Sequence, residues 1–213
     1  SPTRTDSLRQ QDSFDWKLEP DTQKDKRTCT FTNGALHAIA SQTWPLALCT
    51  EQANMYTAVA VQVDMTFLPS GGKDGIYSGG IILHAKDASD NAPMYRARIG
   101  SDGTYDIFVQ DDTSIPKHKG RLSTCPNPQD PRAQSRFYNG DAATSPYIIQ
   151  GTNQINTVML IAVGNLIALF INGHHIQTVC DSDSPGGLIG IFAAPPSNIK
   201  TDVAFSNLMI WVL

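Results

Sequence analysis

Apolar and polar residues alternate along several short segments of this chain. The clearest case is 56–67, YTAVAVQVDMTF, in which every second residue from Val59 to Phe67 is Val, Met or Phe. Successive side chains of a strand point to opposite faces, so this period of two predicts a strand with one side in a core. The nearly continuous apolar run TVMLIAV, at 157–163, predicts a central strand.

Two further segments have the pattern of β-hairpins. MYRARIGSDGTYDIFV, at 94–109, has turn residues at 100–103 between two alternating stretches, and LIALFINGHHIQTV, at 166–179, carries Asn172-Gly173 in its middle. Asn-Gly supplies the positive φ angles that a tight two-residue turn requires. No segment shows a helical period with caps at both ends. The sequence therefore predicts an all-β fold, a two-sheet antiparallel sandwich or jelly roll.

The spacing of strands is interrupted between 111 and 151, where five prolines occur and few alternating apolar residues do. A loop of this length in a compact domain is usually functional or disordered, so we expect a Pro-rich loop insertion here. The whole chain, 1–213, is expected to form one jelly-roll domain, since all-β sandwiches often reach this length undivided. Residues 1–13 are expected to be a flexible lead-in.

Composition narrows the classes of function. Apolar residues make up 40% and charged residues 17% of the chain, which is enough apolar content for a core. The net charge of −4 and the absence of a basic tract argue against nucleic acid as a partner. No apolar run approaches the ~18 residues of a membrane helix, so we expect no membrane insertion by this segment. Because the chain opens without Met or a signal-peptide pattern, it is interpreted as an excised or mature segment.

The chain contains four cysteines, Cys29, Cys49, Cys125 and Cys180. No pair forms a CxxC and none has a His at metal-ligand spacing, which argues against zinc. An even number of cysteines in a Gly/Pro-punctuated β chain fits an oxidising compartment, with three pairings open.

An ordered set of short motifs extends over most of the chain. The segment 165–213 runs from a strand through an Asn-Gly hairpin and a glycine-rich turn to TDVAFSN and a final Ile-Trp pair. Upstream lie CTFTNGALHAIASQTWPLALC at 29–49, SGGIILHA at 78–85 and the hairpin at 94–109. This order resembles the concanavalin A/laminin-G-like jelly-roll domains of bacterial surface and sensor-kinase-linked proteins.

The resemblance implies a location and a class of function. Such domains lie at the extracytoplasmic end of larger membrane-anchored proteins, and related jelly rolls bind glycans or hydrolyse them. We therefore expect an extracellular or cell-surface, non-catalytic ligand-binding or sensor module, directed at a carbohydrate or similar surface ligand. A glycoside-hydrolase-type enzyme with an atypical site and a structural adhesion or spacer domain stay open as alternatives. The resemblance also implies that the last strand pairs beside the first.

The resemblance places a cysteine-bounded hairpin at the start of the domain, with its turn near 41–45. A disulfide between Cys29 and Cys49 would join the two neighbouring strands. Cys125 then remains for Cys180, which would tie the long loop to the strand after the Asn-Gly hairpin. Two separate thiols at these positions are the alternative.

Retaining glucanases of the jelly-roll type carry Glu-x-Asp-x-x-Glu on one strand, which supplies the nucleophile and the acid/base. The comparable strand here, VQVDMTF at 61–67, offers Asp64 alone. One carboxylate cannot fill both roles, so Asp64 is interpreted as a solvated or hydrogen-bonded strand residue, and no catalytic residue is assigned.

The candidate ligand-binding residues are aromatic, basic or imidazole side chains near the middle of the chain. They are His84, Arg96, Arg98, Tyr105, Phe137 and Tyr138. Two arginines on one sheet face could bind a sugar acid or phosphate bidentately, or pair with neighbouring carboxylates. Aromatic residues in the loop suit stacking on sugar rings or cover the sheet instead.

No organic cofactor is expected. Related jelly rolls hold one structural calcium near the chain ends, and the resemblance makes Asp202 the residue to watch for it.

Overall fold

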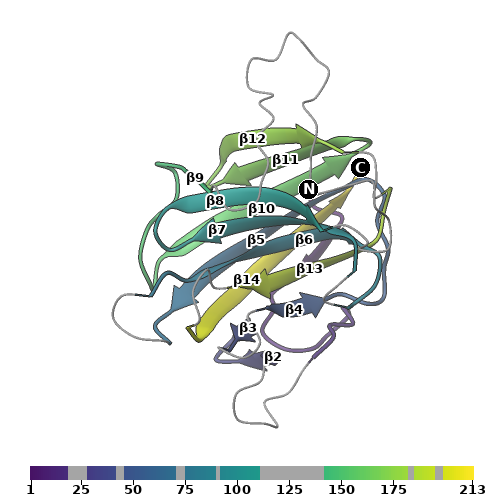
Figure 1. Cartoon of the computed structure of the whole chain (residues 1–213). Helices are drawn as coiled ribbons and strands as arrows, with labels where there is room; N and C mark the ends of the chain where they lie inside the picture. Colours follow the sequence, from purple (N-terminus) through teal and green to yellow (C-terminus); the bar gives the residue numbers. More distant parts are fainter. Residues whose placement is uncertain are drawn as a thin grey trace.

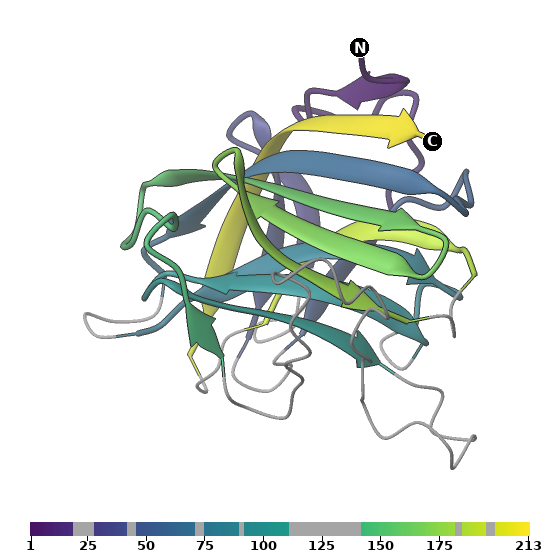
Figure 2. The ribbon, with the colours of Figure 1, turned by 90° about the horizontal axis from the view of Figure 1, so that it is seen from above.

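The computed structural model describes residues 1–18, 28–41, 46–70, 75–89, 92–110, 142–181, 185–194 and 199–213. These residues form two antiparallel β-sheets that pack face to face, as the two layers in Figure 2 show. The described residues contain no helix, and so none that could cross a membrane. The fold is the predicted all-β sandwich.

The first sheet has eight strands in the order β12-β11-β10-β5-β14-β3-β2, with β1 also pairing with β14 (Figure 1). Their bounds are β1 Arg4–Asp6, β2 Thr28–Thr32, β3 Ala35–Ala40, β5 Val59–Leu68, β10 Ile155–Val163, β11 Leu166–Ile171, β12 His174–Cys180 and β14 Thr201–Val212.

The second sheet has six strands in the order β4-β13-β6-β7-β8-β9. Their bounds are β4 Ala47–Thr50, β6 Ser78–Ala85, β7 Met94–Gly100, β8 Thr104–Gln110, β9 Ala143–Thr144 and β13 Leu188–Ala193. Both predicted hairpins are present, as β7–β8 and β11–β12, and the run at 157–163 is a central strand, β10.

The core lies between the sheets and is lined by every second residue of each strand. In β5 the five residues at odd positions from Val59 to Phe67 are buried, as the alternation predicts. In β14 the buried positions change from Val203 and Phe205 to Leu208 and Ile210, because a β-bulge lies between Ser206 and Met209. Asn207 takes a positive φ of 54° in this bulge.

The N-terminal segment is part of the sandwich, which corrects the expected flexible lead-in at 1–13. Strand β1 pairs with β14, and Leu8 is buried in the core. The buried carboxylate of Asp6 accepts hydrogen bonds from Trp16 Nε1, at 3.0 Å, and from the backbone N–H of Leu8, at 2.7 Å. Burial of apolar side chains and a satisfied carboxylate therefore hold this segment in place.

The final strand is internal to its sheet, as the resemblance implied. Strand β14 pairs with β5 along one edge and with β3 and then β1 along the other. Phe205 lies in the core, whereas Trp211 is only half-buried and points to the outer side of the sheet.

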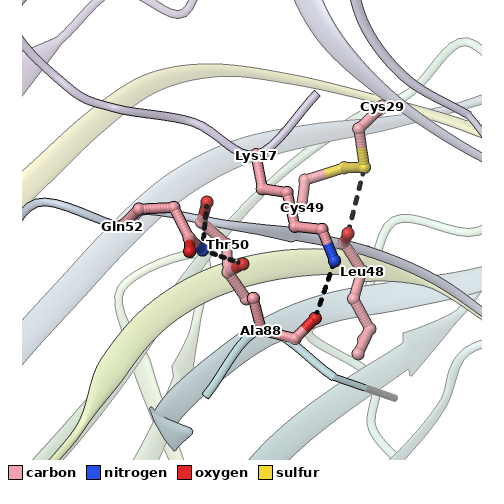
Figure 3. The surroundings of a disulfide bond; sticks show 7 residues. All are labelled: Lys17, Cys29, Leu48, Cys49, Thr50, Gln52 and Ala88. Carbon is pink, nitrogen blue, oxygen red and sulfur yellow. Dashed lines mark hydrogen bonds between the residues drawn. A yellow bond between two sulfur atoms is a disulfide. The ribbon is translucent and has the colours of Figure 1, made fainter. Parts of the chain in front are cut away.

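The structure contains the predicted disulfide Cys29–Cys49, with 5.7 Å between the Cα atoms. The expected hairpin around it is wrong, because β2 pairs with β3 across an Asn33-Gly34 turn and β4 belongs to the other sheet. The bridge therefore joins the two sheets. Cys29 Sγ lies 3.1 Å from the Leu48 carbonyl oxygen (Figure 3). This is a contact rather than a hydrogen bond, because a disulfide sulfur carries no hydrogen.

Cys180 is also disulfide-bonded. Cys125, its predicted partner, lies outside the described residues, so the pairing Cys125–Cys180 stays a prediction.

The end of the expected insertion, 142–151, belongs to the folded sandwich. Strand β9 pairs with β8, and Ile148 is buried in the core. The fully buried side chain of Asn156 binds both the backbone N–H and the carbonyl of Ile149, at 2.8 and 2.9 Å. Residues 111–141, including Phe137 and Tyr138, lie outside the described residues.

Replacing Cys29 and Cys49 together by Ala should lower the free energy of unfolding by about 3 kcal/mol, because the bridge closes a loop of about 20 residues in the unfolded chain. Urea unfolding of the oxidised double variant and the wild type measures this loss. A double variant within 1 kcal/mol of the wild type would contradict the expected contribution.

Candidate ligand-binding face

Polar and aromatic side chains gather on the outer face of the six-stranded sheet, on strands β7 and β8. The register pairs Arg96 with Phe108 and Arg98 with Asp106, so these four residues share one face. Tyr95, whose side chain points the other way, lies in the core. The prediction that the two arginines share one sheet face is confirmed.

Arg96 lies between two phenylalanine rings. Its guanidinium carbon is 4.1 Å from the centre of the Phe108 ring and 5.7 Å from that of Phe192 on β13. Burial, with a smaller effect from the nearby charge of Arg98, lowers the pKa of Arg96 to about 10. The guanidinium therefore stays charged at neutral pH, and its attraction to the ring faces fixes its position.

Arg98 forms an ion pair with Asp106 across the β7–β8 hairpin. The side chain of Arg98 is 27% exposed and that of Asp106 17%, so both reach the surface of this otherwise covered face. Burial raises the pKa of the Asp106 carboxyl above its ordinary 3.8, although Arg98 acts in the opposite direction.

The carboxylate of Asp106 is only partly satisfied. Its buried Oδ1 has no hydrogen-bond partner within the part of the chain that the structure describes. Buried carboxylate oxygens are normally satisfied, so a hydroxyl donor fits this position. Asp106 is also the only Asp or Glu in the strands of the six-stranded sheet.

The other half of the same face is apolar and covered. Leu48, Ile82, Met94 and Phe192 belong to a small buried cluster, against which Ala88 and two other partly buried apolar residues pack. Lys17 Nζ donates a 3.1 Å hydrogen bond to the Ala88 carbonyl and holds this covering segment in place (Figure 3). The accessible part of the face is therefore the part around Arg98, Asp106 and Phe108.

The structure separates His84 and Tyr105 from the two arginines. His84 is 1% exposed and lies at a β-bulge between β6 and β13, with its ring 5.6 Å from that of Tyr95. Tyr105 pairs with Ile99 and packs against the core. Both residues therefore belong to the inner side of the sheet rather than to a ligand face.

Asp202 is engaged within the eight-stranded sheet. Its Oδ1 lies 2.8 Å from Nδ1 of the buried His37 on β3. No group of three or more His, Cys, Asp or Glu side chains occurs in the described ranges that could hold a metal ion. Calcium also takes backbone carbonyl oxygens and water as ligands, and the site at Asp202 stays a prediction of the resemblance alone.

Asp64 is hydrogen-bonded within its sheet, as the sequence predicted. It accepts from Thr157 Oγ1 at 2.6 Å and from Asn207 Nδ2 at 2.8 Å. Two donors satisfy this carboxylate, and it lies on the eight-stranded sheet, away from Arg98 and Asp106.

Asp106, Phe108 and Phe192 were not singled out from the sequence. The hairpin pattern at 94–109 held a signal for two of them, because folding it about Gly100–Gly103 places Asp106 opposite Arg98 and Phe108 opposite Arg96. Phe192 comes from β13, more than 80 residues away, and no local pattern indicates its position.

No known family model and no curated protein matches this sequence. Solved structures do match. The carbohydrate binding module CBM66 of Bacillus subtilis is 11% identical, with a TM-score of 0.61 over 92% of this chain and 94% of the module. A Bacillus subtilis protein of unknown function with a galectin-like fold is 12% identical, with a TM-score of 0.55 over 100% of this chain and 96% of that one.

The alginate lyase A1-II', a member of polysaccharide lyase family 7, is 14% identical, with a TM-score of 0.51 over 88% of this chain and 83% of the lyase. At these identities the likeness concerns the fold. The chain has the jelly-roll, galectin-like β-sandwich fold that carbohydrate-binding modules and glycan-active enzymes also have.

The raised pKa of Asp106 has a consequence for stability. The folded state binds this proton more tightly than the unfolded chain does, so ionisation destabilises the fold as the pH rises from near 3.8 through the folded pKa. Asp106→Asn should therefore gain stability relative to the wild type between about pH 3 and pH 7. Urea unfolding across this range measures the difference, with Asp15→Asn at an exposed position as the control. A difference that is flat with pH, or of opposite sign, would contradict the burial of Asp106.

Proposed function

We propose that this chain is a non-catalytic, extracytoplasmic glycan-binding or sensor module of the concanavalin A/laminin-G-like type, and that it is part of a larger membrane-anchored protein. The observation that carries the proposal is the Arg98–Asp106 pair beside Phe108 on the outer face of the six-stranded sheet. The proposed ligand site is the accessible part of this face.

The chemistry of these three side chains suits a sugar. The guanidinium of Arg98 can donate to ring or hydroxyl oxygens, and the partly exposed carboxylate of Asp106 can accept from a hydroxyl. The Phe108 ring adds apolar surface for C–H groups. Arg98 and Asp106 hold each other in place before the ligand arrives, which lowers the entropy cost of binding.

The carboxylates support a binding module over a glycosidase. Glycoside hydrolysis generally uses two carboxyl groups, about 5 to 10 Å apart, across the scissile bond. The strands of the proposed face carry Asp106 alone, and Arg98 neutralises it. The names of the matched structures, which include a carbohydrate binding module, agree with a glycan ligand. The Cys29–Cys49 disulfide is compatible with an extracellular location.

A glycan-array screen of the oxidised protein, with and without calcium, should give specific binding. Arg98→Ala should weaken the affinity for the best glycan about 10- to 100-fold, because a hydrogen bond to a charged group contributes roughly 1.5 to 3 kcal/mol. Isothermal titration of the wild type and the variant measures this change.

Arg9→Ala, which removes one positive charge at an exposed position away from the sheet, is the matched control and should bind like the wild type. Thermal unfolding checks that both variants fold. A blank array, or equal loss of affinity in both variants, would contradict the proposal. Release of shorter glycan products would point to the enzyme alternative.

A further inference from the structure

The outward side of the eight-stranded sheet is unusually apolar. Strands β11, β10, β5 and β14 are neighbours, and their register sets the outward residues in rows. One row is Phe170, Met159, Gln62 and Met209, and the next is Ala168, Ile161, Ala60 and Trp211. We call Met159, Ile161, Ala168, Phe170, Met209 and Trp211 the outer apolar face.

These side chains are accessible rather than part of the core. All six are half-buried, and at the end of the same strands Leu166 is 46% and Val163 40% exposed. Ala60, which lies between Ile161 and Trp211 in its row, is only 5% exposed, because taller side chains flank it. The larger neighbours therefore form the accessible surface of these rows and cover Ala60.

An antiparallel sheet that faces water on one side normally alternates apolar-in with polar-out. The two rows break this rule, since seven of their eight residues are apolar and none is charged. The following row returns to polar residues, with Thr157, Asp64 and Ser206. A contiguous exposed apolar patch with a polar rim is typical of an interaction surface.

We propose that the outer apolar face binds the same face of a second copy of this chain. A two-fold axis through the sheet would set the two outer apolar faces against each other, so that the apolar rows of one copy pack on those of the other. Each copy carries a net charge of −4, so two copies approach most readily through a surface without charges. The face is mainly aliphatic, which suits packing against a protein more than stacking on sugar rings.

The size of the face predicts the strength of the dimer. Four strands spaced about 4.8 Å apart and three rows, counting Leu166 and Val163, cover roughly 400 Å² in projection. A stable interface of standard size uses about 800 Å² per partner. The dimer is therefore expected to be reversible, with a dissociation constant in the micromolar range.

The proposal is independent of the glycan site, since that site lies on the other sheet, which forms the opposite layer in Figure 2. A dimer joined through the eight-stranded sheets would leave both ligand faces on its two outer sides. Two sites in one particle would raise the avidity for a polymeric ligand.

Sedimentation equilibrium of the whole chain, from about 1 µM to 1 mM, tests the proposal. The wild type is expected to shift from monomer to dimer across this range. Ile161→Lys and the rim variant Leu166→Lys should each raise the dissociation constant at least tenfold, because two-fold symmetry places each new charge twice in the interface. Thr66→Lys adds the same charge in a polar position of the same sheet face and should dimerise like the wild type.

Thermal unfolding shows whether the variants fold. If Ile161→Lys does not fold, Leu166→Lys still tests the proposal, because Leu166 is exposed and its replacement leaves the core intact. A monomer at 1 mM would overturn the proposal. So would a dimer that persists in both variants, since it would use another surface. Binding of aliphatic detergent by a protein that stays monomeric would also overturn it, by indicating a different occupant.

Discussion

The pairing of β14 with β5 is the contact on which the rest of the sandwich depends. Strand β14 joins β5 along its whole length, and its other edge receives β3 and then β1. The four strands come from the first 68 residues and the last 13, so the middle of this sheet combines the two ends of the chain. Such distant pairing costs loop-closure entropy, which the apolar side chains of both strands must offset when they enter the core.

Local patterns were sufficient to predict the fold class and several of the strands. The alternation of β5, the β7–β8 hairpin and the Asn172-Gly173 turn each depend on neighbours in sequence, and each is present in the structure. The pairing of Cys29 with Cys49 was predicted correctly, but the bridge joins the two sheets rather than two strands of one hairpin. Whether a strand such as β4 joins one sheet or the other depends on contacts with β13, which lies some 140 residues along the chain.

The ligand face was predictable only in part, because some of its contacts also come from strands that are distant in the sequence. The alternation of the strand places the two arginines on one face, and the hairpin register places Asp106 opposite Arg98. The second aromatic ring beside Arg96 comes from β13, and the burial of His84 comes from a bulge that no alternation indicates. Burial also decides the chemistry, because Arg96 and Asp106 have shifted pKa values only in the folded sheet.

The bulge at Asn207 determines which side chains of β14 face the core and which face outward. Before it, odd-numbered residues enter the core, and after it even-numbered residues do, so one extra residue changes the parity of the strand. If the strand alternated regularly through Asn207 instead, Met209 and Trp211 would turn inward, and Leu208 and Ile210 would come to the surface. One backbone position thus decides which residues of the C-terminal strand pack in the core and which remain on the outer face. The asparagine at this position also donates a hydrogen bond from its side-chain amide to Asp64.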